Sequence, residues 1–181
     1  MGETKNSFFK ELVGSEYALI VICFLAVLFF SSYHLFDSPE VWLDEGLIIQ
    51  SSIGLLETGK AALPVAPGVF EPAWYITTGF PVTLALATAF SLFGVSLEAA
   101  RIVMLIFLLL FYFVLFIYTR KVFGKFTGWL SFMLLVFFGP LYGHGRNVLG
   151  EIPGLLFIIL ALLPLVGERP LAKSRALTVG L

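Results

Sequence analysis

Runs of almost uninterrupted apolar residues divide this chain and constrain its fold more than any other feature. They cover residues 17–36, 74–94, 99–118, 126–142 and 152–166, and a further run begins near residue 176. The chain is 59% hydrophobic and 13% charged, with 20 Phe among 181 residues, which is more apolar material than one globular core takes up. Runs of about 20 apolar residues match the thickness of a bilayer. The sequence therefore predicts an all-α, polytopic membrane protein.

The first apolar run follows a polar tail, residues 1–16, which we expect to lie in the cytoplasm. The run 17–36 is longer than the core of a signal peptide, and no small-x-small cleavage pattern follows it. We therefore expect it to be a retained signal anchor. The net charge of −1 gives no basic excess of the kind that binds nucleic acid. Cys23 is the single cysteine, so the chain forms no internal disulfide.

The distribution of basic residues shows that one apolar run does not cross the membrane. If every run crossed, the two basic clusters would lie on opposite sides, against the preference for Lys and Arg in the cytoplasm. These clusters are Arg120, Lys121 and Lys125, and Arg169, Lys173 and Arg175. The run 74–94 is the weakest span, because it contains Pro81, Gly79 and four threonines. We predict that it is an interfacial or re-entrant helix.

The topology that follows has spans at about 17–36, 99–118, 126–142 and 152–166, with the next span starting near 176. Residues 17–181 then form one transmembrane domain with a long first external loop, 37–98. That loop has seven acidic residues against one basic residue, Lys60. Within the loop, 44–58 has the pattern of an amphipathic helix that ends at Gly59. Residues 61–72 contain three prolines and predict a constrained turn.

An acidic pair, Asp44 and Glu45, opens the first external loop directly after an apolar span. Carboxylates beside a bilayer often serve a site, because placing them against lipid is costly. The alternative is a solvated helix N-terminus, where acidic residues favour the positive end of the helix dipole. The topology puts Asp44, Glu45, Arg146 and Glu151 on one face of the membrane. For Arg101 and Arg146, anion binding and simple anchoring at the interface both remain open.

The order of these features resembles the N-terminal part of the C-type (GT-C) membrane glycosyltransferases. The branch in question contains the protein O-mannosyltransferases and the lipid A aminoarabinose transferase, and the resemblance covers about residues 17–166. It is carried by the ordered set of motifs rather than by one motif. The motifs are the acidic pair 44–45, Thr-Gly-Lys at 58–60, Pro-x-Trp-Tyr at 72–75, the stretch 92–101 ending in Arg101, Arg-Lys-Val-Phe-Gly at 120–124, and Arg146 ahead of Glu151.

The resemblance implies a GT-C-like helical bundle that transfers a sugar, with inversion, on the extracytoplasmic side of the cell or endoplasmic reticulum membrane. The donor would be a polyprenyl-phosphate-linked sugar, and a protein, lipid or glycan would be the acceptor. Asp44 matches the general base that takes the proton of the acceptor hydroxyl. Glu45 would orient the acceptor or Asp44. Arg101 and Arg146 would bind the phosphate of the donor.

Glu151 departs from the family pattern, in which the second acidic residue is commonly an Asp preceded by Pro. Here Gly150 precedes a longer glutamate. Three roles stay open for Glu151: binding a divalent cation together with Asp44, contacting the acceptor, or stabilising the N-terminus of the fourth span. No metal site is assigned with these residues. The resemblance also implies further spans, so we expect this chain to be an N-terminal part that is inactive by itself.

The main alternative is a non-enzymatic membrane transporter or a subunit of an assembly. Such a protein would place ionisable groups deep inside its spans. The interiors of 99–118, 126–142 and 152–166 contain no Asp, Glu, Lys or His. A hydrolase acting on lipid phosphates is a second alternative, but the nucleophile or metal cluster that it needs is not visible in the sequence.

Overall fold

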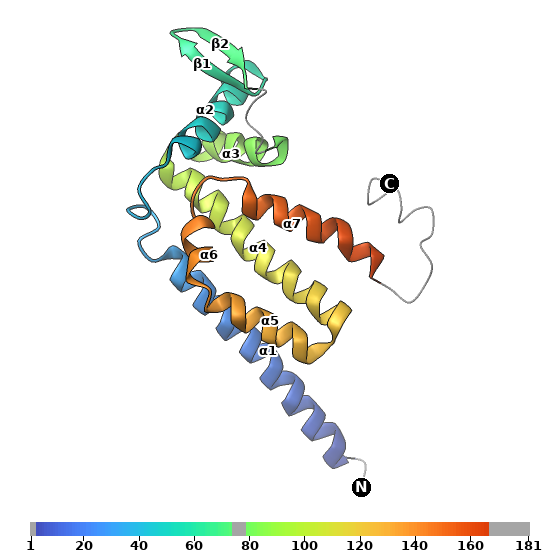
Figure 1. Cartoon of the computed structure of the whole chain (residues 1–181). Coiled ribbons are helices and arrows are strands. Elements are labelled where there is room, and N and C mark those ends of the chain that lie inside the picture. Colours follow the sequence, from blue (N-terminus) through green and yellow to red (C-terminus); the bar gives the residue numbers. More distant parts are fainter. Residues whose placement is uncertain (1–2, 74–78, 167–181) are drawn as a thin grey trace.

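The computed structural model describes residues 3–73 and 79–166 and is mostly helical (Figure 1). The predicted span near 176, the basic residues at 169–175 and the start of the run 74–94 lie outside these residues. The elements, in chain order, are α1 (Glu3–Ser32), α2 (Leu43–Thr58), β1 (Ala62–Ala66), β2 (Val69–Pro72), α3 (Phe80–Phe93), α4 (Leu97–Phe123), α5 (Lys125–Val136), α6 (Gly139–His144), α7 (Glu151–Leu162) and a 3₁₀ turn, η1 (Leu163–Leu165).

Helices α1, α4, α5 and α7 alternate in direction along the chain, and α4 lies among the other three (Figure 1). Their contact faces are apolar and aromatic, and they bury Leu108, Tyr112, Phe116, Phe132 and Leu156. The turn between α4 and α5 is tight because Gly124 adopts a φ of 89°. At the crossing of these helices, a Cβ on Gly128 would lie 2.8 Å from Cβ of Arg120. The close approach of α4 and α5 therefore requires a glycine at position 128.

Helices α2 and α3 lie across the end of the bundle where α4 begins (Figure 1). They pack on each other, and α3 also packs on α4, around the buried residues Ile48, Val82, Leu86, Phe90, Ala100 and Met104. The helix predicted for 44–58 is confirmed to within one residue. It ends as expected at Gly59, whose φ of 73° is left-handed and whose N–H donates to Leu55 O.

The segment 61–72 forms a β-hairpin, which corrects both the all-α prediction and the expectation of a simple turn. Ala62 is paired with Pro72 and Leu63 with Glu71. The strands are joined through Pro67 and Gly68, which has a φ of 75°, so a Pro-Gly turn reverses the chain and lets the flanking residues pair. The hairpin packs against α2, where a Cβ on Gly54 would lie 2.0 Å from Ala62 O.

The apolar run 126–142, predicted as one span, is not one continuous helix, and its crossing of the membrane stays a prediction. Helix α5 ends at Val136 and α6 begins at Gly139. Pro140 has no N–H to donate to Val136 O, so the helical hydrogen-bond pattern fails at this point. Two tyrosine hydroxyls donate hydrogen bonds to the backbone carbonyls at the break. Tyr142 donates to Val136 O, and Tyr112 donates to Leu135 O at 3.0 Å.

Helix α4 is, within the described residues, the one helix that is long and apolar enough to span a membrane. It covers the predicted span 99–118 and extends beyond it at both ends. Helices α3, α5 and α7 are apolar but shorter, with 14, 12 and 12 residues. At about 1.5 Å per residue, the 14 residues of α3 extend for about 21 Å, less than the ~30 Å hydrocarbon layer.

Candidate functional site

Two of the predicted site residues, Glu45 and Arg101, meet in a buried ion pair. Glu45 lies in the first turn of α2 and Arg101 in the second turn of α4, and the side chains of both are 0% exposed. Arg101 Nε donates to Glu45 Oε1 and Nη2 donates to Oε2, each at 3.2 Å. Two parallel bonds of this kind fix the orientation of both side chains.

The guanidinium of Arg101 is fully engaged by the protein. Besides Glu45, it donates to Leu35 O at 2.9 Å, Phe36 O at 3.5 Å and Pro39 O at 2.7 Å. An arginine has five N–H groups, and these five bonds use all of them. Binding of a donor phosphate by Arg101, as the resemblance implies, would require at least one of these bonds to break.

Glu45 also ties the first external loop to the segment between α6 and α7. Its Oε1 accepts a 3.2 Å hydrogen bond from Val148 N. The ion pair therefore joins four parts of the chain: the turn after α1, the start of α2, the start of α4 and the segment that leads into α7. The acidic pair thus lies at the same end of the bundle as Arg146 and Glu151. The side of the membrane to which this end belongs stays a prediction.

Arg146 lies beside this network and is less completely bonded. Its Nε donates to Tyr142 O at 2.8 Å and its Nη1 donates to Tyr33 O. Its Nη2 has no hydrogen-bond partner within the described residues. Partial burial, and after it the positive charge of Arg101, lower the pKa of the Arg146 guanidinium below its ordinary value. Glu45 offsets only one of these two positive charges, so an anion would be stabilised at Arg146.

Asp44 is exposed at the first turn of α2, next to the anchored Glu45. Successive residues of a helix point about 100° apart, so the bonds of Glu45 also set the direction of Asp44. Trp42 is the N-cap of α2 and makes no side-chain cap bond. In the described part of the chain, the Asp44 carboxylate has no ion pair or hydrogen bond. It is available to a substrate at the positive end of the helix.

Glu151 is exposed in the first turn of α7, and Gly150 is the N-cap of that helix. Within residues 3–73 and 79–166, no group of three or more His, Cys, Asp or Glu side chains is placed to hold a metal ion. The divalent cation considered for Glu151 and Asp44 stays a prediction. The position of Glu151 at the positive end of the helix dipole also fits the simpler role of stabilising α7.

Asn147, which follows Arg146 directly, was not among the residues predicted from the sequence. Its Oδ1 is buried and has no hydrogen-bond partner among the described residues. A buried carbonyl without a partner costs about 1–3 kcal/mol, and such atoms often have a ligand or solvent role. In the sequence, Asn147 is visible only as the last residue of the short run Gly-His-Gly-Arg-Asn. That run does not indicate that the side chain of Asn147 is buried.

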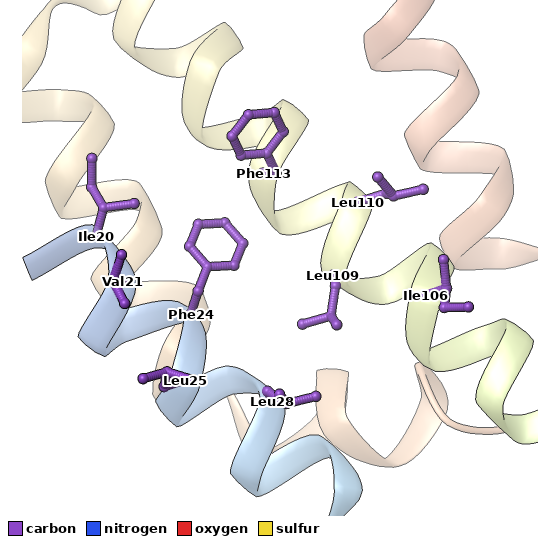
Figure 2. Close-up of a pocket in the computed structure, with 9 residues that line it drawn as sticks. All are labelled: Ile20, Val21, Phe24, Leu25, Leu28, Ile106, Leu109, Leu110 and Phe113. Atoms are coloured by element: carbon purple, nitrogen blue, oxygen red, sulfur yellow. The ribbon is translucent and has the colours of Figure 1, made fainter. Parts of the chain in front are cut away.

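An apolar groove leads along α1 and α4 toward this end of the bundle. Its volume is about 500 Å³. Figure 2 shows Phe24 and Leu28 of α1 opposite Leu109 and Phe113 of α4. The rings of Phe24 and Phe113 lie 6.1 Å apart, edge to face. Along α1 the groove points to Tyr33, whose carbonyl binds Arg146.

Comparison with known proteins adds no family to this description. No protein-family model, no curated protein and no solved structure matches the chain.

Proposed function

We propose that this chain is part of a polytopic membrane glycosyltransferase that transfers a sugar from a polyprenyl-phosphate donor on the extracytoplasmic side. The observation that carries the proposal is the buried pair of Glu45 and Arg101 at one end of the bundle. Exposed Asp44 precedes Glu45 in the chain, and incompletely bonded Arg146 is affected by the charge of Arg101. A base and an anion-binding group then lie at the same end of an apolar helical bundle.

The arrangement of the helices supports several membrane crossings. Helices α1, α4, α5 and α7 alternate in direction (Figure 1), as four successive spans must. Large apolar side chains on their outer faces are exposed, including Leu25, Phe29, Ile106, Phe113, Leu134 and Ile158. An apolar surface of this extent is typical of a protein that faces lipid. The short helices α5 and α7 then need tilt or thinning of the bilayer.

In the proposed reaction, Asp44 is the general base. The oxygen of the acceptor hydroxyl attacks the anomeric carbon of the sugar and forms the new glycosidic bond, while its proton passes to the Asp44 carboxylate. The bond between the anomeric carbon and the phosphate oxygen breaks on the opposite face, and its electron pair leaves with the polyprenyl phosphate. An exposed carboxylate without a protein partner is suited to this proton transfer.

Arg146 is the proposed contact of the donor phosphate. Its Nη2 is unoccupied by the described protein groups, and the nearby charge of Arg101 favours an anion there. The groove between α1 and α4 supports this assignment (Figure 2). Its lining reaches Leu28 of α1, five residues before Tyr33, whose carbonyl accepts a hydrogen bond from Arg146, so an isoprenoid chain in the groove can direct its phosphate toward Arg146. Glu45 and Arg101 are positioning residues in this proposal, and the acceptor class stays open.

The charge distribution favours this proposal over a transporter. Among the buried residues of the described chain, Glu45 and Arg101 are the charged ones, and both lie at the end of the bundle. A path for an ion or a charged solute would need such groups along the helices.

The proposal is tested in two steps in lipid nanodiscs. The first step measures binding of a polyprenyl phosphate to the purified chain. The second measures transfer of a radiolabelled sugar from the polyprenyl-phosphate sugar to an acceptor mixture by the intact protein that contains this chain. Arg146→Gln should weaken binding of the polyprenyl phosphate, whereas Asp44→Asn should leave this binding intact and abolish transfer. The size expected for loss of a general base is about 10²–10⁴-fold in rate.

Asp37→Asn is the matched control, since Asp37 is another exposed carboxylate of the first external loop. It should change neither binding nor transfer. If the folded Asp44→Asn variant transferred sugar at the wild-type rate, Asp44 would not be the base. If Arg146→Gln bound the polyprenyl phosphate as tightly as the wild type, the phosphate site would have to lie elsewhere.

A further inference from the structure

A second apolar groove, between α3 and α4, has a volume of about 870 Å³. Each helix contributes residues spaced four apart, which lie on one face of the helix. They are Leu84, Thr88 and Leu92 of α3 and Ile102, Ile106 and Leu110 of α4. The five apolar side chains among them are between 44% and 70% exposed. The volume is within the range of about 300–1,000 Å³ that is typical of ligand sites.

The charge at the mouth of this groove is negative. Glu98, in the first turn of α4, is the one charged residue among those that line the groove. The other polar side chains are already engaged: Thr88 donates to Leu84 O at 2.8 Å, and Ser96 caps α4 by accepting from Ala99 N at 3.1 Å. The Glu98 carboxylate has no partner in the described part of the chain. A ligand with a cationic end is therefore favoured at the mouth, and an anionic one is opposed.

The length of the groove matches one leaflet of a bilayer. From Glu98 to Leu110 there are twelve residues of α4, which at about 1.5 Å each extend for about 18 Å. One leaflet of the hydrocarbon layer is about 15 Å thick. With the membrane orientation proposed above, Glu98 lies at the outer headgroup level and Leu110 lies near the middle of the bilayer.

We infer that the groove between α3 and α4 binds an outer-leaflet phospholipid with an ammonium headgroup, held by its acyl chain along α3 and α4 and by its ammonium group at Glu98. The site shares Ile106 and Leu110 of α4 with the groove proposed for the polyprenyl-phosphate donor. It differs in that its other wall is α3 rather than α1 and that its charged residue is a glutamate rather than an arginine. The inference rests on the proposed membrane orientation but is independent of glycosyl transfer.

Native mass spectrometry of the whole chain tests this inference, after incubation in detergent with equal amounts of phosphatidylethanolamine and phosphatidylglycerol of the same acyl chains. The wild type should retain phosphatidylethanolamine in preference, by about two- to fivefold, the range expected for a partly exposed ion pair. Glu98→Gln should abolish the preference while lipid is still bound. Ala85→Phe should reduce retention of both lipids, because Ala85 lines the groove.

Two control variants should behave as the wild type. Glu57→Gln removes an exposed carboxylate of α2 outside the groove, and Leu25→Phe alters the groove between α1 and α4. Equal retention of the two lipids by the wild type, a preference for phosphatidylglycerol, or an unchanged preference in Glu98→Gln would overturn the inference. A lipid-free dimer would show instead that a second copy covers the groove. If Ala85→Phe does not fold, the lipid preference of the Glu98→Gln variant still tests the inference, because Glu98 is exposed.

The proposed membrane orientation is tested independently of lipid binding. Labelling of the Lys60→Cys variant from outside the cell would support the orientation even if no lipid is retained. In that case the lipid site alone would be rejected.

Discussion

Glu45 and Arg101 are 56 positions apart in the sequence and form a two-point ion pair with both side chains fully buried. Taking two charges out of water is expensive, and the cost is recovered only when their remaining hydrogen-bonding capacity is also satisfied. Here Arg101 is satisfied by three backbone carbonyls between Leu35 and Pro39, and Glu45 by the amide of Val148. The pair thus fixes the geometry of the end of the bundle at which Asp44 and Arg146 lie.

Removing one partner of this pair should destabilise the protein strongly. Glu45→Leu or Arg101→Met leaves a buried charge alone, at a cost of about 3–5 kcal/mol. The double variant should lose less than the sum of the single losses, because it leaves no unpaired charge. Unfolding in detergent, followed by circular dichroism, gives the three values. Strict additivity would mean that the two side chains do not interact energetically.

Arg101→Lys should not be tolerated, although it keeps the charge. A lysine ammonium has three donors against the five that Arg101 uses, so at least two acceptors lose their partner. Each buried group left unpaired costs about 1–3 kcal/mol. Arg120→Lys, at the other end of α4, serves as the comparison and should cost less. A wild-type unfolding midpoint for Arg101→Lys would contradict the bonding described for Arg101.

Glycines 46 and 54 of α2 should respond in opposite ways to the same substitution. A Cβ on Gly54 meets Ala62 O at 2.0 Å, whereas a Cβ on Gly46 meets nothing within 4 Å. Gly54→Ala must therefore displace the hairpin, at a cost of about 1–3 kcal/mol or more. Gly46→Ala should stabilise α2 by about 0.5–1 kcal/mol, because alanine loses less backbone entropy in a helix. The two unfolding midpoints should bracket that of the wild type.

Asn147→Leu should separate stability from function. Asn147 Oδ1 has no partner to lose within the described residues, so the variant should be as stable as the wild type or more stable by up to about 1–3 kcal/mol. If the amide contacts the sugar or a water at the site, transfer should nevertheless fall. Gln50→Leu, on the exposed face of α2, is the control and should leave transfer unchanged. Lower stability with full activity would remove Asn147 from the site.

Cysteine labelling tests the membrane orientation, with Cys23 replaced by alanine. Lys60→Cys and Val95→Cys flank α3, and Phe126→Cys lies just after the turn from α4 to α5; all three positions are exposed. If α3 does not cross, a membrane-impermeant maleimide should label positions 60 and 95 in intact cells and position 126 only after permeabilisation. Labelling at 60 but not at 95 would mean that the segment before Val95 crosses the bilayer.

The sequence alone determined the features that depend on local composition. Helix 44–58 and its end at Gly59 were predictable because hydrophobic spacing and a left-handed glycine act within a few residues. The apolar run 99–118 was predictable as the core of α4 for the same reason. The break in 126–142 was also local, since Pro140 removes one N–H, but the apolar composition of that run concealed it. The paired strands of the hairpin depend on the Pro67-Gly68 turn and on packing against Gly54.

Tertiary structure alone decided what the charged residues do. The sequence indicated Asp44, Glu45, Arg101, Arg146 and Glu151 as candidates, but it did not distinguish the exposed residues among them from the buried ones. Folding brings Arg101 within 3.2 Å of Glu45 and uses every N–H of its guanidinium, while it leaves Asp44 exposed and Arg146 partly unbonded. Such distinctions depend on contacts between segments far apart in the chain, and no local pattern encodes which hydrogen bonds these contacts fill.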